Sequence, residues 1–173
     1  HTLFTENILS GEAYEAALQT FLSNELLLSD YRISEVEKGI IPMTNLAFTR
    51  MSGKLMFIGT AGGQTKASTG YTFQFIQKHS EAIVHQLIAG LPLENISQPG
   101  RFTFYDSVLL RVLQEGKMPG DEVFYTLFRK NKASHVFSFL DNTTDFLREF
   151  LIMNTTPKGI FFPAAIKEML RRH

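Results

Sequence analysis

The chain has neither cysteine nor tryptophan among its 173 residues. Without cysteine it has no disulfide, no thiolate nucleophile and no cysteine-based zinc site. Its 17 basic residues balance 17 acidic ones, so the charge gives no indication of nucleic-acid binding. The 5 histidines are scattered, and the two on one predicted helix, His79 and His85, are spaced so that they fall on different faces. We therefore expect neither a metal site nor a nucleic-acid partner.

Long hydrophobic runs are also missing, since no apolar stretch approaches the roughly 18 residues that a membrane-spanning helix requires. No signal-peptide pattern opens the chain, and it begins at His1 rather than at methionine. We expect part of a longer cytoplasmic protein. What the chain has in abundance is phenylalanine, with 16 residues. The simplest explanation is a helical core, and the alternatives are a long apolar substrate or a membrane-facing surface.

In the first third of the chain, polar and apolar residues alternate with the period of a strand that has one wet face. Ser10 is placed to cap a helix between two such strands. A short apolar run that ends at Gly59 predicts a buried strand instead. The stretches concerned are residues 2–5, 31–37 and 39–43 for the alternating strands, 11–25 for the helix and 54–58 for the buried strand.

A helical period follows at residues 70–89, and Gly90 is placed to end that helix. His79 and His85 fall off its apolar stripe and are expected at the surface or its margin. The stripe itself is predicted to face the core and consists of Phe73, Ile76, Ser80, Ile83, Val84, Leu87 and Ile88.

The final third has a helical period throughout, and its Phe/Leu pairs are most simply core, with a lipid-binding groove as the alternative. Strands come first and helices last, which predicts an α+β fold. The expected helices span residues 102–115, a segment capped by Asp121, residues 135–140 capped by Ser134, a segment capped by Thr144, and a last one with Pro163 in its first turn.

The glycine loop, residues 59–70, connects the predicted buried strand to the helix after it. It combines four glycines with threonine and serine, so its backbone N–H groups could approach an anionic ligand at the positive end of that helix. An ordinary strand-to-helix turn has the same composition, and both interpretations stay open. Its glycines are Gly59, Gly62, Gly63 and Gly70.

Glu37 is a carboxylate beside an apolar strand, where alternation breaks at Lys38 and Gly39. Apolar surroundings that keep it protonated would make it a general acid. The alternative is a solvated charge at a sheet edge.

Four separated segments resemble the lycopene β-cyclase family. Residues 58–73, I-G-T-A-G-G-Q-T-K-A-S-T-G-Y-T-F, are similar to its C-terminal flavin-binding motif, I-G-x-A-G-G-x-x-K-P-[ST]-T-G-Y-x-F. Residues 37–44 resemble its E-x-G-x-[IL]-P-M segment. The stretch R-F-T-F-Y-D at residues 101–106, followed by L-L-R-V-L, resembles R-F-x-x-Y-D…L-L-R-V-L, and F-L-D-N-T-T at residues 139–144 resembles F-L-D-E-x-T.

The resemblance implies the C-terminal part of an FAD-binding, p-hydroxybenzoate-hydroxylase-like fold. Residues 1–52 would then belong to the substrate sheet, residues 53–92 would form a returning strand-loop-helix of the flavin domain, and residues 93–173 would be an all-helical cap over an apolar cavity. The family's dinucleotide fingerprint is absent here. Its acidic E-x-T motif would place a glutamate just before His1, with Thr2 and Phe4 as the continuation.

The implied reaction is cyclisation of lycopene ends to β-ionone rings without net redox change. Acid–base chemistry would be assisted by reduced FAD, with NAD(P)H as possible reductant, and the long apolar polyene implies a cytoplasmic protein peripheral to the membrane. Glu37 matches the family's E-x-G segment and is expected to be a supporting or second catalytic acid. The residues expected to bind the cofactor are Gly59, Thr60, Gly62, Gly63, Lys66, Ser68, Thr69 and Gly70.

Two positions depart from the motif: Ala67 replaces a proline, and Thr60 stands where related hydroxylases have aspartate. Lys66 beside a flavin would favour an anionic reduced ring, with a solvated loop lysine as the alternative. Other functions left open are an FAD-dependent reductase or monooxygenase acting on an isoprenoid or aromatic, and a non-catalytic fragment that binds lipid or a partner. The isolated chain is expected to be inactive and to bind flavin weakly, because half of the cofactor site would lie upstream.

Overall fold

The computed structural model describes residues 7–93 and 100–171, which form two units that divide between Gly39 and Ile40. The first unit contains helix α1 (Gly11–Asn24). As predicted, Ser10 caps this helix, its side-chain oxygen accepting a hydrogen bond from the N–H of Ala13 at 3.2 Å. No residue of α1 is buried within the chain.

The strands predicted at residues 31–37 and 39–43 are wrong, because both stretches are irregular. A strand exists only through hydrogen bonds to a neighbour, and the described chain offers these stretches no partner. The strand predicted at residues 2–5 lies outside the described residues.

The second unit begins with a small antiparallel hairpin of β1 (Met51–Ser52) and β2 (Leu55–Met56), paired in the register Met51 to Met56. Gly53 adopts a φ of 58° in its turn, a conformation that glycine reaches without strain. The strand predicted at residues 54–58 is shorter than expected, and it is not buried, since Leu55 is 68% exposed. The fold is α+β, mostly helical with this one two-stranded sheet in the described chain.

Helix α2 (Phe73–Ile88) confirms the predicted helix, and Gly90 follows it with a φ of 62°. Its predicted core stripe is wrong within this chain. Phe73, Leu87 and Ile88 are exposed, whereas Phe75 and His79 are buried. Of these two, His79 had been expected at the surface or its margin. A helical period identifies residues that share a face, but burial depends on what covers that face.

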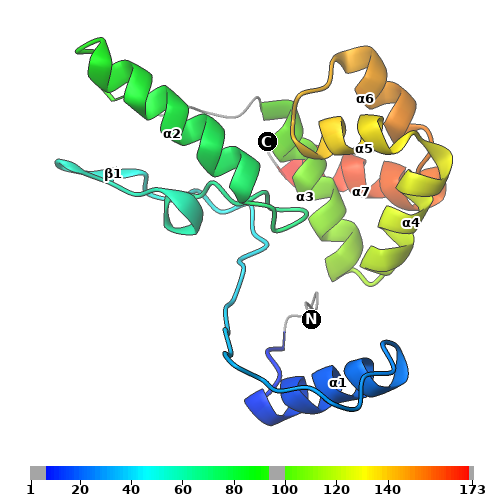
Figure 1. Cartoon of the computed structure of the whole chain (residues 1–173). Helices are drawn as coiled ribbons and strands as arrows, with labels where there is room; N and C mark the ends of the chain where they lie inside the picture. Colours follow the sequence, from blue (N-terminus) through cyan, green and yellow to red (C-terminus); the bar gives the residue numbers. More distant parts are fainter. Residues whose placement is uncertain (1–6, 94–99, 172–173) are drawn as a thin grey trace. The chain divides into compact units, whose positions relative to one another are not determined.

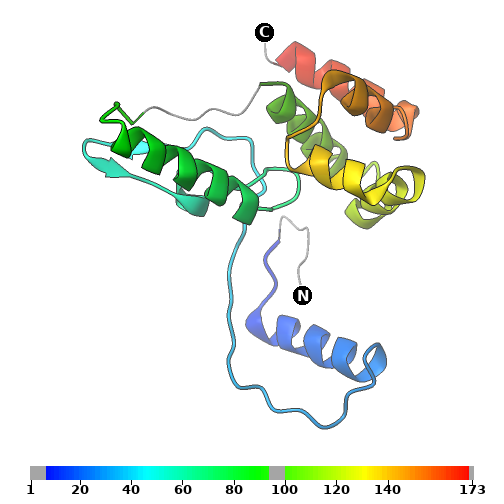
Figure 2. The same cartoon turned by 45° about the horizontal axis from the view of Figure 1, so that its top comes forward.

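Five helices follow and form the helical region: α3 (Gly100–Gln114), α4 (Gly120–Lys130), α5 (Ala133–Leu140), α6 (Phe146–Met153) and α7 (Lys158–Arg171). Figures 1 and 2 both show them gathered together, with α7 in red beside α3 in green. These helices confirm the helical period predicted for the final third, but the expected core position of its Phe/Leu pairs is wrong in α6, where Phe146 and Leu147 are both 71% exposed. The shared core consists of Val108, Val112, Met118, Val123, Leu127, Val136, Leu140, Ile152 and Ala164.

The predicted helix starts are less accurate than the helices. Pro119 is the N-cap of α4 rather than Asp121, and Lys132 is the N-cap of α5 rather than Ser134. Asp145, not Thr144, caps α6 by accepting a hydrogen bond from the Arg148 N–H at 2.8 Å. Pro163 lies inside α7, because that helix begins at Lys158.

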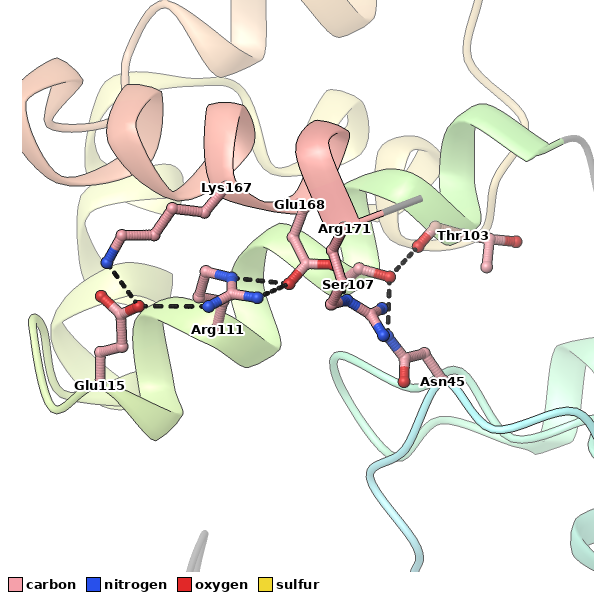
Figure 3. Close-up of polar contacts among 8 residues, drawn as sticks. All are labelled: Asn45, Thr103, Ser107, Arg111, Glu115, Lys167, Glu168 and Arg171. Atoms are coloured by element: carbon pink, nitrogen blue, oxygen red, sulfur yellow. Dashed lines mark hydrogen bonds and ion pairs between the residues drawn. The ribbon is translucent and has the colours of Figure 1, made fainter. Parts of the chain in front are cut away.

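An ionic network joins α3 to α7 (Figure 3). Arg111 donates to Oε1 of the buried Glu168 at 2.6 Å, and Arg171 donates to its Oε2 at 3.0 Å. Burial acts to raise the pKa of Glu168, but the hydrogen bonds from Arg171 and Arg111 outweigh it and the pKa is lowered. Glu115 accepts from Arg111 at 3.3 Å and from Lys167 at 2.8 Å. The two helices that begin and end the helical region are thereby fixed to each other.

Candidate functional site

The glycine loop begins with the 3₁₀ helix η1 (Gly59–Gly62) and turns at Gly63, which has a φ of 72°. A Cβ atom on Gly62 would lie 2.1 Å from the carbonyl oxygen of Phe57, so no larger residue fits without moving the backbone. A Cβ on Gly63 would lie 2.9 Å from Cβ of Phe48. These two glycines therefore serve the close packing of the loop itself.

Much of the loop backbone is satisfied internally. The N–H groups of Gly62, Gly63 and Gln64 bond to carbonyls at the start of the loop, and the N–H of Gly70 bonds to the carbonyl of Lys66 at 2.8 Å. The first N–H groups of a helix, by contrast, have no acceptor within that helix. In η1 the N–H groups without a partner in the helix lie at the start of the loop, at the edge where Thr60 is exposed. This edge is the part of the loop best suited to donate hydrogen bonds to a ligand.

Three threonine hydroxyls connect that edge to the beginning of α2. Thr65 donates its hydroxyl hydrogen bond to Thr60 at 3.2 Å and lies 2.9 Å from the hydroxyl of Thr72, the N-cap residue of α2. The starts of η1 and α2 are thus close together and carry hydroxyl groups. Thr65 donates its hydrogen to Thr60 and Thr72 donates to the carbonyl of Gly70, so a ligand with acidic oxygens would find backbone donors and the Thr60 hydroxyl here.

The other side of the loop is buried against α3. Lys66 is 4% exposed, and its Nζ lies 2.7 Å from Oδ1 of Asp106, which is 5% exposed. Ser68 donates to the same Oδ1 at 2.5 Å, and Lys66 also donates to Oδ1 of Asn142 at 2.8 Å. Burial lowers the pKa of the Lys66 ammonium, while the Asp106 charge opposes that shift. The alternative of a solvated loop lysine is therefore wrong.

A cavity of about 790 Å³ lies within the second unit. Its wall is mostly apolar, with aliphatic side chains such as Val108 and Leu127. Lys66, Ser68 and Asp106 also line it and are called the polar corner below. The aromatic residues of the wall are Phe102, Phe104, Tyr105, Phe124, Phe139, Phe150, Phe161 and Phe162.

A second buried carboxylate lies behind this wall. Glu149 is 0% exposed and accepts hydrogen bonds from Nε of Arg101 at 3.0 and 3.1 Å and from the Tyr105 hydroxyl at 3.0 Å. Burial and the bond to Glu149 raise the pKa of Tyr105 to about 12. The network fixes the ring of Tyr105, which stacks on Phe139 at a centroid distance of 6.0 Å.

The family model described as lycopene cyclase protein matches residues 1–168. The chain belongs to the lycopene cyclase family. Neither the curated proteins nor the solved structures contain a match. Membership supports an enzyme with a lycopene cyclase function in carotenoid biosynthesis, and it confirms the family to which the four sequence segments pointed.

The residues predicted for cofactor binding in this lycopene cyclase chain divide into two groups. Gly59 and Thr60 lie at the accessible start of the loop, whereas Gly62, Lys66 and Ser68 are buried. The other three residues belong to the turn that leads into α2. Gly63 and Gly70 have positive φ angles, of 72° and 73°. The hydroxyl of Thr69 accepts a hydrogen bond from the N–H of Tyr71 at 3.2 Å.

Glu37, the predicted catalytic acid, is exposed in an irregular stretch of the first unit, and its role stays a prediction. Residues 7–93 and 100–171 contain no group of three or more His, Asp or Glu side chains placed to bind a metal ion. Nor is any helix in that part of the chain both long and apolar enough to cross a bilayer.

Sequence reasoning missed Asp106, Asn142 and the threonine pair Thr65 and Thr72. Asp106 and Asn142 both stand inside segments that resemble the cyclase family, which was the available signal. Nothing local indicated these contacts, since Asn142 is 76 positions from Lys66 and Asp106 is 38 positions from Ser68.

Proposed function

We propose that the cavity binds one end of lycopene and that the protein carrying this chain cyclises that end to a β-ionone ring, with no net redox change. The observation that carries the proposal is the mostly apolar cavity, whose few polar lining residues include the polar corner. Its volume of about 790 Å³ falls within the range of roughly 300–1,000 Å³ typical of small-molecule sites. An end group and a length of polyene fit such a space, and they require no polar partner along most of the wall.

The chemistry favours such a site. Cyclisation of an olefin requires an acid that protonates it, surroundings that tolerate the carbocation, and a base that removes a proton. Aromatic faces attract cations, and the wall of the cavity offers several, Tyr105 and Phe139 among them. Charges act strongly in a space that excludes water. Glu37 remains our candidate for a supporting acid.

We propose that FAD contacts the accessible edge of the glycine loop, at Gly59, Thr60 and the start of α2. The fit rests on the Thr60 hydroxyl and on helix-start N–H groups at that edge. A reduced flavin would supply negative charge that stabilises a carbocation, and NAD(P)H could reduce it. Lys66 and Ser68 would act from the buried side of the loop, holding its shape through Asp106.

We also propose a peripheral membrane contact at α6. Phe146 and Leu147 are both 71% exposed, and Phe150 is 60% exposed while also lining the cavity. The cavity wall therefore continues onto an exposed apolar surface, which suits a substrate that dissolves in lipid rather than water. Replacing Phe146 and Leu147 by serine should reduce co-flotation with lipid vesicles, whereas the same change at exposed Tyr125 on α4 should not. Equal flotation of all variants would contradict this contact.

The test of the proposed function is expression of the complete protein in a host that accumulates lycopene, under reducing conditions. We expect a cyclised product with the same mass as lycopene. A product mass changed by two hydrogens or one oxygen would instead identify a reductase or monooxygenase, and unchanged lycopene would refute the cyclase reaction.

A cavity-filling variant links that activity to the cavity. Ala165→Trp places a large ring at a position that lines the cavity, and we expect conversion to fall by about 10-fold or more. Ala133→Trp, at the exposed first residue of α5, is the matched control and should retain conversion. Equal conversion by both variants would mean that the substrate binds elsewhere.

A further inference from the structure

We propose that Asp106 is a catalytic residue of the cyclisation, the base that takes the proton from the ring carbocation, with Lys66 and Ser68 as the residues that position it. This inference rests on the proposed function, because it needs a carbocation in the cavity. Of the described residues that line the cavity, Asp106 is the one carboxylate.

The Asp106 carboxylate is oriented by contacts at one of its two oxygens. Both contacts of the Asp106 carboxylate, the 2.7 Å ion pair with Lys66 and the 2.5 Å hydrogen bond from Ser68, end on Oδ1. Oδ1 is therefore held in place, and the carboxylate that it anchors lines the cavity.

The charge of the polar corner suits a base. The Lys66 ammonium lies 2.7 Å from Oδ1 of Asp106, and a carboxylate can both attract a cation and accept a proton. An olefin acid must carry its proton at the start of the reaction, whereas a base must not. The pairing with Lys66 therefore suits the role of base and not that of the initial acid.

Stability alone does not explain the buried pair of Lys66 and Asp106. Two charges buried in an apolar wall lose their hydration, and replacing such a pair with apolar residues is often neutral or stabilising. A polyene forms no hydrogen bond with the polar corner, so the substrate itself gains nothing from it. A carbocation that forms beside the corner would be stabilised by the negative charge of Asp106.

The proton balance closes without another reactant. The acid donates one proton to the terminal double bond, and ring closure leaves a tertiary cation in the new ring. Asp106 then accepts a proton from the carbon next to that cation, and the electrons of the broken C–H bond form the ring double bond. The carboxylate becomes a carboxylic acid. It then loses its proton to solvent while the acid takes one from solvent, and both groups return to their starting states.

The position of the base also decides the product. The ring cation is flanked by a CH, a CH₂ and a CH₃ group, and loss of a proton from each gives a different double-bond isomer. A carboxylate fixed by Lys66 and Ser68 faces one of these groups in preference to the others. Loosening it should therefore change the isomer ratio, a readout that a purely structural contact would not affect.

The decisive experiment measures the initial rate of lycopene cyclisation by the complete protein and its variants, with products separated by chromatography. We expect Asp106→Asn to lower the rate by about 100-fold or more, and Asp106→Glu to recover part of the loss. The matched control is Glu168→Gln, which alters another buried, ion-paired carboxylate that does not line the cavity. It should stay within about threefold of the unchanged protein, after correction for the folded fraction.

A second variant covers the case in which Asp106→Asn does not fold. Ser68→Ala keeps both charges but removes the 2.5 Å hydrogen bond, and it should raise the share of the unconjugated ring isomers. The inference is overturned if Asp106→Asn stays within about threefold of the unchanged protein, if Glu168→Gln loses as much activity, or if Ser68→Ala leaves both rate and isomer ratio unchanged. Failure of the unchanged protein to cyclise lycopene would instead overturn the proposed function, and with it this step.

Discussion

Arg101→Met tests how much the ion pair between Arg101 and the buried carboxylate of Glu149 contributes to the stability of the protein. Glu149 is 0% exposed and is held by Arg101, by the Tyr105 hydroxyl and by Thr144, whose hydroxyl lies 3.4 Å from Oε1. Methionine keeps much of the length of arginine and removes its charge. The carboxylate would then be left with neutral donors in a dry site.

The expected cost follows from this geometry. Removing one partner of a fully buried ion pair costs about 3–5 kcal/mol. The Arg101 side chain is 31% exposed, and two neutral donors remain on Glu149, so we expect about 2–3 kcal/mol. For a chain of this length that loss corresponds to a Tm lower by about 5–10 °C.

The assay is thermal and urea unfolding followed by circular dichroism. In the double variant Arg101→Met with Glu149→Gln, the uncharged amide should restore at least half of the lost stability, because no buried charge remains unpaired. Arg148→Met, at an exposed arginine beside Glu149 in the sequence, should change stability by less than about 0.5 kcal/mol. A loss below about 0.5 kcal/mol for Arg101→Met, or no recovery in the double variant, would refute the reasoning.

Three further predictions concern the backbone, a titration and a helix cap. Gly62→Ala should lower the free energy of unfolding by more than about 2 kcal/mol, because the new Cβ would meet the Phe57 carbonyl oxygen. The control Gly159→Ala, in α7, places its Cβ in open space and should be neutral or stabilising by up to about 1 kcal/mol. Urea unfolding measures both variants. Tyr105 has a folded pKa of about 12, above its usual 10.0, so its contribution to stability is complete below pH 10 and lost as the pH rises towards 12. Between those pH values the free energy of unfolding should fall more steeply with pH for the unchanged chain than for Tyr105→Phe. Parallel plots of stability against pH would contradict the raised pKa of Tyr105. Asp145→Ala should cost about 1 kcal/mol through loss of the α6 cap, and an unchanged Tm would rule the cap out.

The helices of the final third could be predicted from sequence because their signals are local. Val108 and Val112, or Val123 and Leu127, recur at helical spacing and belong to the core. Their starts were harder to place, because neighbouring residues compete for the cap. Thr144 and Asp145 are both suitable, and the geometry selects Asp145.

The features that could not be predicted depend on what lies opposite each segment. The apolar stripe of α2 is a property of its sequence, but burial of Phe75 and exposure of Leu87 depend on which face meets a neighbour. The alternating residues 31–37 require a partner strand before they become a sheet. The polar corner was hidden for the same reason, because Lys66 and Asp106 meet only after the chain has folded over a long separation.

The long sequence separation between the glycine loop and its partners in the helical region sets the order in which these parts fold. Lys66 and Asn142 are joined by a hydrogen bond across 76 positions, and Ser68 and Asp106 across 38, whereas the helices are built from contacts within one turn. Closing long chain segments costs entropy and is slow, so the helical region should form first and the glycine loop should dock onto it afterwards. The edge proposed to hold the cofactor would then gain its shape only as folding ends, and flavin affinity would depend on how completely the helical region has assembled.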